Sequence, residues 1–340
     1  MMTAPTLSYA QRYEDLHLLR AFGEQPAGTY IDICAGHPVY DNVSFAFYLR
    51  GWSGITVEPN PWLAELSAAV RPRDRRIQAL VGSAPGEATY YLVEDYHGLS
   101  TTIASNAQAA QQEYGKASKA MRMPVTTLAA LCELHAPGAL DFLKIDVEGA
   151  EREVLLGGDW RRFRPRVVVL EALAPVTMEP SWDTWESLLT GNGYRFALFD
   201  SLNRYYVAEE HGALAARLEA SPTTFDGATQ FRNFRPALDD RSHPDHVLAQ
   251  RLAGTDMVRL PLLSAEQIVA YLAGADLDRP ASDADIASAH AALFGGAPSP
   301  AWIADLKLSR DATIDELYRR IIDSELFRAA CGRISASTAW

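Results

Sequence analysis

The sequence predicts an α/β protein built on an open, mostly parallel β-sheet with helices on both faces, followed by a helical tail. Between residues 28 and 211, short β-branched runs alternate with short helical patterns. This alternation is typical of parallel βαβ units, whose crossover helices cover the sheet. Two runs, Leu140–Ile145 and Arg166–Glu171, are almost continuously apolar, as strands buried on both faces are.

The expected strands are rich in β-branched and aromatic residues and cover Thr29–Ile33, Gly54–Glu58, Ile77–Val81, Thr89–Val93, Leu140–Ile145, Arg166–Glu171, Tyr194–Phe199 and Arg204–Val207. The expected helices between them cover Asn42–Arg50, Pro61–Val70, Thr127–His135, Ala150–Leu156 and Trp182–Thr190. Only Ser201–Asn203 separates the last two strands, which predicts an antiparallel hairpin closing the sheet.

Four regions follow from these patterns. Residues 1–27 form a short N-terminal helical segment, and residues 28–211 form the sheet domain. Residues 212–245 have no steady period, which indicates a linker or a segment covering the sheet. Residues 246–340 show only helical spacing, so we expect a small helical domain there.

One signal for a helix start stands out within the tail. Thr313 and Glu316 resemble a capping box, in which two side chains satisfy backbone N–H groups. An apolar stripe follows it, formed by Leu317, Ile321 and Ile322.

Composition excludes several classes of protein. The chain has 340 residues, with 31 Lys and Arg against 43 Asp and Glu, a net charge of −12. So acidic a chain lacks the field that draws proteins to nucleic acid or anionic lipid. Three scattered cysteines make no disulfide framework, and no stretch reaches the ~18 apolar residues of a membrane span. The N-terminal stretch does not look like a signal peptide. We therefore expect a soluble, cytoplasmic protein.

The first two strands end in residues suited to a nucleotide-like ligand. Asp32 and Gly36 lie where the first strand enters a loop, although the loop lacks a full glycine fingerprint. Glu58 follows 26 residues after Asp32, and a carboxylate at the end of the second strand commonly accepts ribose hydroxyls. The alternative for Glu58 is a network that caps the helix starting at Pro61.

The densest signal is the run from Asp141 to Glu151. It delivers Asp146 to the end of a buried strand, with Glu148 and Gly149 at the following turn. Two carboxylates there are costly to desolvate without partners, and they suit an ammonium group, a metal ion or a substrate hydroxyl. The alternative is that Asp146 caps the next helix and Glu148 is solvated.

This run resembles the signature of the FkbM family of S-adenosylmethionine-dependent methyltransferases. Further segments resemble the family in the same order, over about residues 28–210: His37–Ser44, Arg50–Gly54, Gly98–Thr101, Pro124–Leu128 and Val168–Glu171. The departure is Cys34, where the family usually has glycine, so the loop has to accommodate a side chain.

The resemblance implies the class I methyltransferase fold, a Rossmann-like, seven-stranded, mostly parallel sheet ending in an antiparallel hairpin. It implies methyl transfer from S-adenosylmethionine to a hydroxyl, often on a sugar or glycan. The first loop would border the methionine part, Glu58 would hold the ribose, and the end of the third strand would lie by the adenine. The cofactor-binding residues would be Asp32, Cys34, Gly36, Glu58, Asn60, Gly82, Ser83 and Asp146.

Methyl transfer needs an aligned acceptor oxygen and a group that takes its proton. The candidate bases are Asp146, Glu148 and His37, and His37 has the most suitable ordinary pKa. Asp146 and Glu171 end neighbouring strands. Related sugar O-methyltransferases of a different family hold a divalent ion such as Mg²⁺ at such positions, where it would acidify sugar hydroxyls. We do not favour a metal and assign it no ligands, because Glu171 can instead satisfy backbone groups of its loop.

Two other classes of function stay open at this point. One is an NAD-dependent oxidoreductase on a Rossmann sheet, which the incomplete glycine fingerprint disfavours. The other is a non-catalytic scaffold that binds glycans or partners. For the favoured function, the expected partners are a sugar, nucleotide-sugar or glycan acceptor. The C-terminal helices would support a homo-oligomer or bind a partner enzyme.

Overall fold

The computed structural model describes residues 6–23, 25–93, 97–135, 140–218, 225–276, 279–296, 299 and 322–339. The chain forms two compact units. The first comprises Met1–Ala68 with Arg73–Phe231, and the second comprises Ala69–Pro72 with Arg232–Trp340.

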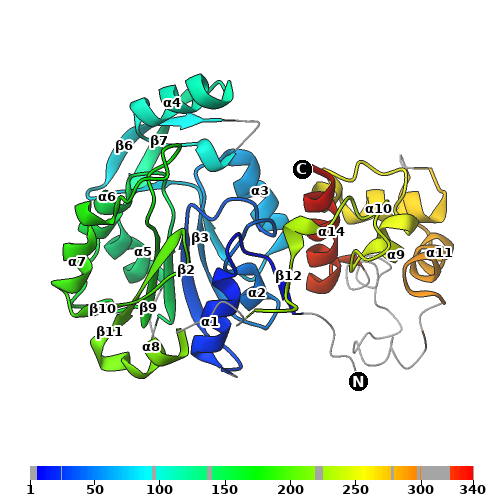
Figure 1. Ribbon diagram of the computed structural model, residues 1–340. Helices are drawn as coiled ribbons and strands as arrows, with labels where there is room; N and C mark the ends of the chain where they lie inside the picture. The colour runs from blue at the N-terminus through cyan, green and yellow to red at the C-terminus, as the bar shows by residue number, and fades with distance from the viewer. Residues whose placement is uncertain are drawn as a thin grey trace. The chain divides into compact units, whose positions relative to one another are not determined.

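A seven-stranded sheet forms the centre of the first unit (Figure 1). Its strands are β2 (Thr29–Ile33), β3 (Ser53–Val57), β4 (Arg75–Ile77), β8 (Phe142–Ile145), β9 (Val167–Glu171), β10 (Tyr194–Phe199) and β11 (Asn203–Ala208). Their order across the sheet is β10-β11-β9-β8-β2-β3-β4. All neighbours are parallel except for β10 and β11, which pair as a hairpin whose β11 runs antiparallel to β9. The expected mostly parallel sheet with a closing hairpin is therefore confirmed.

Strand alternation divides the core between the two faces of this sheet. Along β2, Ile31 and Ile33 face one cluster of buried side chains, and Tyr30 faces another. The first face is covered by α5 (Leu128–His135), α6 (Glu151–Leu156) and α7 (Glu186–Thr190), and the second by α1 (Glu14–Phe22), α2 (Phe45–Tyr48) and α8 (Ala213–Leu218). The sheet thus has helices on both faces.

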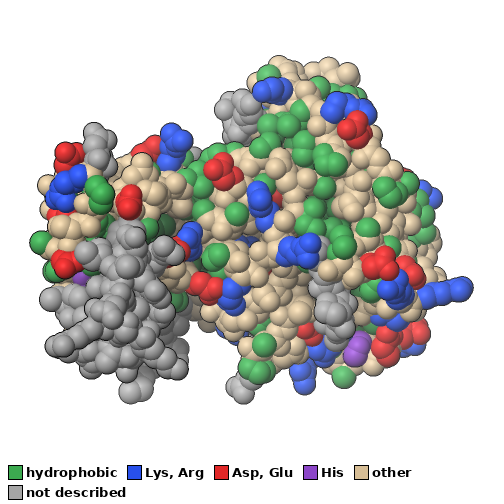
Figure 2. Space-filling view, turned by 180° about the vertical axis from the view of Figure 1, so that it is seen from behind, with side chains coloured by type: hydrophobic (Ala, Val, Ile, Leu, Met, Phe, Trp, Pro, Cys, Tyr) green, Lys and Arg blue, Asp and Glu red, His purple; other side chains and the backbone are tan. Residues whose placement is uncertain are grey.

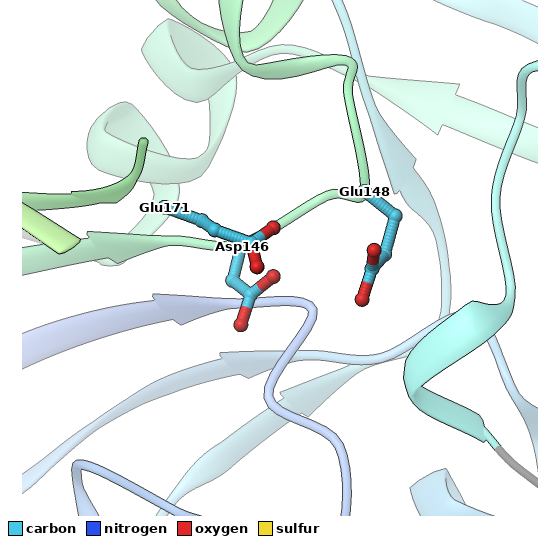
Figure 3. A group of neighbouring side chains, drawn as sticks. All are labelled: Asp146, Glu148 and Glu171. Carbon is cyan, nitrogen blue, oxygen red and sulfur yellow. The ribbon is translucent and has the colours of Figure 1, made fainter. Parts of the chain in front are cut away.

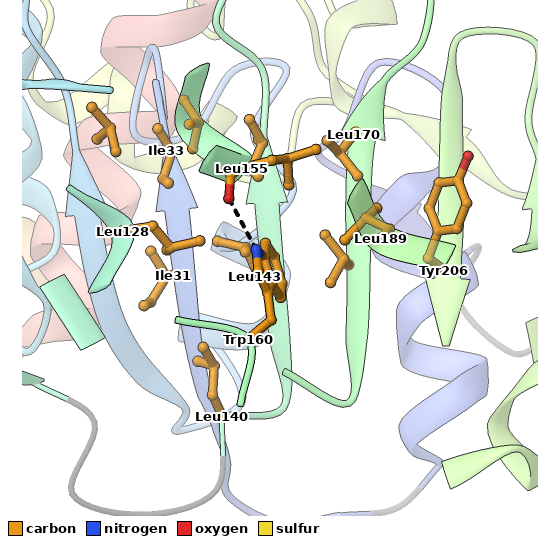
Figure 4. Packing of buried hydrophobic residues seen from close by; sticks show 14 of the residues in the cluster. Ile31, Ile33, Leu128, Leu140, Leu143, Leu155, Trp160, Leu170, Leu189 and Tyr206 are labelled. Carbon is orange, nitrogen blue, oxygen red and sulfur yellow. Dashed lines mark hydrogen bonds between the residues drawn. The ribbon is translucent and has the colours of Figure 1, made fainter. Parts of the chain in front are cut away.

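Figure 4 shows the first of these faces. Leu143 and Leu170 from the central strands pack with Leu128 and Leu155 from the helices. Trp160 lies among them, and its indole Nε1 donates a hydrogen bond of 2.9 Å to the Leu155 carbonyl. The buried aromatic ring therefore satisfies its one polar atom at the end of α6.

A separate three-stranded sheet corrects part of the predicted strand assignment. It consists of β5 (Leu80–Val81), β6 (Gly86–Leu92) and β7 (Lys119–Thr126), in the order β5-β7-β6. The predicted strand Thr89–Val93 lies in this sheet, and the predicted strand Ile77–Val81 is divided between the two sheets. Between β6 and β7 lie η1 (His97–Leu99) and α4 (Ala104–Tyr114), which the patterns did not predict. Alternation identifies a strand but not its partner, so the sequence could not separate the sheets.

The chain outside residues 28–211 also builds the first unit. Strand β1 (Leu7–Ser8) pairs in parallel with β12 (Thr229–Gln230). Helix α8, within the predicted linker, adds Leu214 and Leu218 to the core. Arg217 of α8 donates a hydrogen bond of 3.1 Å to the Ala21 carbonyl of α1. The predicted N-terminal segment and the start of the predicted linker are therefore parts of this unit.

The second unit is helical in its described residues, which include α9 (His246–Arg251), η5 (Leu260–Leu262), α10 (Ala265–Ala273), α11 (Asp283–Phe294) and α14 (Glu325–Ala339). It has its own apolar core, to which Ile322 contributes. Helices α10 and α11 begin with capping boxes at Ser264 and Ser282. The predicted capping box Thr313–Glu316, with Leu317 and Ile321, lies outside the described residues. The division falls after Phe231, before the predicted domain start at residue 246.

Two surface properties bear on function. None of the helices in the described part of the chain is long and apolar enough to span a membrane. On the face shown in Figure 2, Lys and Arg side chains lie interspersed with Asp and Glu rather than gathered in one tract.

Candidate active site

The carboxyl ends of four neighbouring parallel strands collect most of the predicted site residues. Strand β2 leads into the loop that begins at Cys34, and β3 leads into Glu58. Strand β8 leads into Asp146, and β9 ends at Glu171. Since parallel strands end at the same edge of a sheet, residues far apart in the sequence meet there.

An apolar pocket opens at this edge. Its cavity volume is small, about 30 Å³. Its walls come from the ends of β2 and β3, the β5 segment, and the second sheet, and include Ile33, Cys34, Pro59, Val81, Tyr90 and Val147.

Glu58 joins the loops that follow β2 and β3. Its carboxylate is buried and accepts the backbone N–H groups of Gly36 and Asn60, each at 2.8 Å. Burial raises the pKa of Glu58 to about 7, although these two hydrogen bonds act in the opposite direction. Asn60 in turn caps α3 (Pro61–Val70), because its Oδ1 accepts from Trp62 N at 3.0 Å. The capping network considered from the sequence therefore exists.

Cys34 adopts a left-handed backbone conformation, with φ of 59°. Residues with a Cβ enter this region at a cost, which explains why glycine suits the position. The next positive φ, of 63°, is at Gly36. Burial raises the pKa of the Cys34 thiol well above its ordinary value, and nearby carboxylates raise it further. The thiol is therefore a poor nucleophile.

His37 is fully buried in the loop after β2. Its Nδ1 accepts backbone hydrogen bonds from Val39 and Tyr40, both at 3.1 Å. Asp32, also buried, accepts a hydrogen bond of 2.6 Å from Ser44 Oγ. These contacts favour a role for His37 and Asp32 in bracing the loop.

Three carboxylates converge beside the pocket: Asp146, Glu148 and Glu171 (Figure 3). One oxygen from each lies within 4.8 Å of the others. Burial raises the pKa of Glu148 and of Glu171 well above the ordinary value, and the charge of Asp146 raises both further. Glu171 Oε2 is buried and has no hydrogen-bond partner among the described residues. We call these three residues the carboxylate cluster.

Lys144 lies at this site, and our motif analysis missed it. It is buried on β8, and its Nζ lies 2.8 Å from Asp146 Oδ2. Burial alone would lower the pKa of Lys144, but Asp146 and Asp32 raise it above its ordinary value. The ammonium therefore supplies a fixed positive charge to the cluster. A lysine inside an apolar strand, two residues before an aspartate, was the available signal.

The alternative roles for Asp146 and Glu148 are wrong. The first turn of α6 is served by Glu151, whose Oε1 accepts from Val147 N at 3.3 Å and from Gly149 N at 3.1 Å. Glu148 is partly buried rather than solvated. Asp146 and Glu148 are therefore not needed to cap α6, and both carboxylates belong to the cluster.

Ser83 lies away from the pocket. It is exposed, and its Oγ donates a hydrogen bond of 2.6 Å to Glu153. Gly82 N donates to the Thr126 carbonyl at 2.9 Å, as part of the second sheet. The pocket wall is formed by the residues just before them, Ala79, Leu80 and Val81.

Seven strands in this order, with helices on both faces, form the class I methyltransferase fold, and the pocket lies at the carboxyl ends of its parallel strands. Residues 28–196 match the family model of the methyltransferase FkbM domain. This part of the chain therefore belongs to the FkbM family of S-adenosylmethionine-dependent methyltransferases.

No curated protein matches the chain. Among solved structures, it is similar to a TehB-like SAM-dependent methyltransferase from Corynebacterium glutamicum, with 9% identity and a TM-score of 0.32. That match covers 58% of this chain and 88% of the other.

Proposed function

We propose that this protein transfers a methyl group from S-adenosylmethionine to a hydroxyl of a sugar or glycan. The observation that carries the proposal is the carboxylate cluster beside an apolar pocket. Its oxygens can accept hydrogen bonds from neighbouring hydroxyls of a polyol, and one of them can take the proton that the reaction releases.

The residues around the pocket fit S-adenosylmethionine. The apolar walls at Pro59 and Val81 suit a flat base, and Glu58 suits ribose hydroxyls in addition to the two N–H groups it already accepts. Carboxylates at the pocket edge suit the ammonium of the methionine part. The bound cofactor supplies a methyl group already activated on a sulfonium.

Glu148 is the base that the site favours. Burial raises the pKa of Glu148 above its ordinary value, so its ionised form takes up a proton more readily than an ordinary carboxylate does. Lys144 balances the charge of Asp146, which lowers the cost of keeping several carboxylates together. Asp146 and Glu171 then remain to orient the acceptor hydroxyls.

A methyl-transfer assay tests this function. Nucleotide sugars, free glycans and lipid-linked glycans are each incubated with labelled S-adenosylmethionine, and transferred methyl and S-adenosylhomocysteine are measured. We expect transfer to a hydroxyl of one of these classes, and roughly 100-fold slower turnover in Glu148→Gln. Transfer to nitrogen or carbon, or no transfer to any sugar, would contradict the proposal.

The same experiment, together with thermal unfolding, distinguishes a methyltransferase from a non-catalytic scaffold. A methyltransferase is stabilised by its cofactor, because only the folded state binds it. The domain's membership of a methyltransferase family argues against an NAD-dependent oxidoreductase. Stabilisation by NAD but not by S-adenosylmethionine would reverse that conclusion.

Location and assembly complete the proposal. Cys34, Cys132 and Cys331 are all free thiols, which supports a reducing cytoplasm. We further propose that the second unit mediates self-association or binds a partner enzyme. Light scattering of the full chain tests self-association, and a monomer at all concentrations would leave only the partner enzyme.

A further inference from the structure

The backbone of Glu148 is held in an unusual conformation. Its φ is 53°, in the left-handed region that residues with a Cβ rarely occupy. Gly149 follows with φ of 100°. Non-glycine residues persist in such conformations only where their surroundings compensate the cost.

Two side chains from the segment between β6 and β7 donate hydrogen bonds to the backbone carbonyl of Glu148. Thr101 Oγ1 donates to the Glu148 carbonyl at 3.0 Å, and Asn106 Nδ2 donates to the same oxygen at 3.1 Å. Together they fill both lone pairs of that carbonyl. The plane of the peptide that follows Glu148 is thereby held in direction, which restricts rotation of the Glu148 backbone.

The two donors are themselves well anchored. Thr101 is buried, and its backbone exchanges hydrogen bonds of 2.9 and 3.2 Å with Tyr91 of β6. Asn106 lies in the first turn of α4. A Cβ at Gly149 would come within 2.9 Å of Asn106 Nδ2, so the loop and α4 approach as closely as glycine permits.

We propose that Thr101 and Asn106 are positioning residues, which hold Glu148 in its left-handed conformation and so aim its carboxylate into the cluster. This inference rests on the proposed function, in which Glu148 is the base. It gives the segment between β6 and β7 a role in positioning Glu148, in addition to lining the pocket.

The variants are chosen to remove a donor without changing shape. Thr101→Val replaces the hydroxyl by a methyl group, and Thr101→Ser restores the donor. Asn106→Asp is isosteric and replaces the donor by a carboxylate. Aspartate in the first turn also suits the helix dipole, so α4 should not unfold. Ser105→Asp is the matched control, since it adds the same charge one residue away on an exposed side chain.

We expect Thr101→Val and Asn106→Asp to lower kcat roughly tenfold to 100-fold, as a base displaced by about 1 Å would. Affinity for S-adenosylmethionine should change less than about threefold, and the limb of the pH profile due to the base should shift. Thr101→Ser should recover most of the loss, and Ser105→Asp should behave as wild type. Turnover and pH profile unchanged in both donor-less variants would overturn the proposal.

A second measurement does not depend on activity. In a crystal structure of the Thr101→Val, Asn106→Asp double variant, we expect Glu148 to leave the left-handed region and its carboxylate to leave the cluster. If Glu148 keeps its φ near 53°, the positioning role is wrong, whatever the assay shows. A wild-type protein inactive on every acceptor would instead overturn the proposed function, and this structural outcome would still decide the positioning role.

Discussion

At the scale of single residues, one carboxylate can serve both structure and binding. Glu58 ties the loop after β2 to the start of α3 through two backbone N–H groups, in addition to the ribose role expected from its position. Its substitution should therefore affect the folded state as well as the cofactor, and the variant has to be chosen to separate the two effects.

We predict that Glu58→Gln weakens S-adenosylmethionine binding. Losing a charge-assisted hydrogen bond costs about 1.5–3 kcal/mol, which is roughly 10- to 150-fold in affinity. Calorimetric titration measures it. Asp141→Asn is the control, because Asp141 is a buried carboxylate at the opposite end of β8. Equal affinities in Glu58→Gln and the wild type would contradict the ribose assignment.

Cys34 offers a second test at this scale, because its left-handed backbone has a measurable cost. Cys34→Gly should be about 1 kcal/mol more stable than Cys34→Ala, since the two differ only by a Cβ at positive φ. Urea unfolding of the two variants measures the difference. Equal stability would mean that the loop adopts another conformation in solution.

At the scale of elements, the site depends on which strands lie next to each other. Asp146 and Glu171 meet because β8 pairs with β9, and Glu148 joins them from the turn after β8, where its φ is 53°. The negative charge that these carboxylates bring together can be balanced by Lys144 or by a divalent ion.

We predict that exhaustive EDTA treatment leaves methyl transfer unchanged, because Lys144 already places a positive charge against Asp146. Turnover before and after dialysis measures this, with added Mg²⁺ or Mn²⁺ as the control. Activity that falls and is restored by either ion would place a metal on the carboxylate cluster, whose oxygen ligands suit such hard ions.

At the scale of the whole molecule, buried carboxyls should make stability depend on pH. Burial raises the pKa of Glu58 and of Glu151 to about 7, and that of Glu14 to about 8. Between the ordinary value of 4.5 and these values, the folded state binds more protons than the unfolded state. Stability therefore falls as the pH rises through this range.

We predict that the cofactor-free protein has a lower Tm at pH 8 than at pH 6.5, by roughly 2–4 °C for each kcal/mol lost. Burial lowers the pKa of His17 to about 4, so the contribution of His17 to stability rises with pH instead of falling. This rise is confined mainly to pH values below its ordinary pKa of 6.5. Scanning calorimetry at both pH values measures the difference. A Tm that rises toward pH 8 would show that these carboxyls are ionised at little cost.

Periodicity is a local property, and it predicted the strands of the seven-stranded sheet and most of the helices that cover it, but not β7, α4 or α8. Pro61–Val70 and Tyr194–Phe199 have the predicted bounds, and the family signature around Asp146 is a short contiguous run. Local chemistry also identified the end of each parallel strand as the place for functional side chains.

The tertiary structure decided what depends on contacts between distant segments. Lys144 became part of the site because β8 pairs with β2, which brings Asp32 beside Lys144 in addition to Asp146 of its own segment. The second sheet depends on pairing between strands that are distant in the sequence. The hydrogen bonds from Thr101 and Asn106 to Glu148 also join distant segments, and sequence periodicity does not encode such contacts. Periodicity indicates which face of a strand is buried, whereas the packing of the whole domain determines which strands pair with each other.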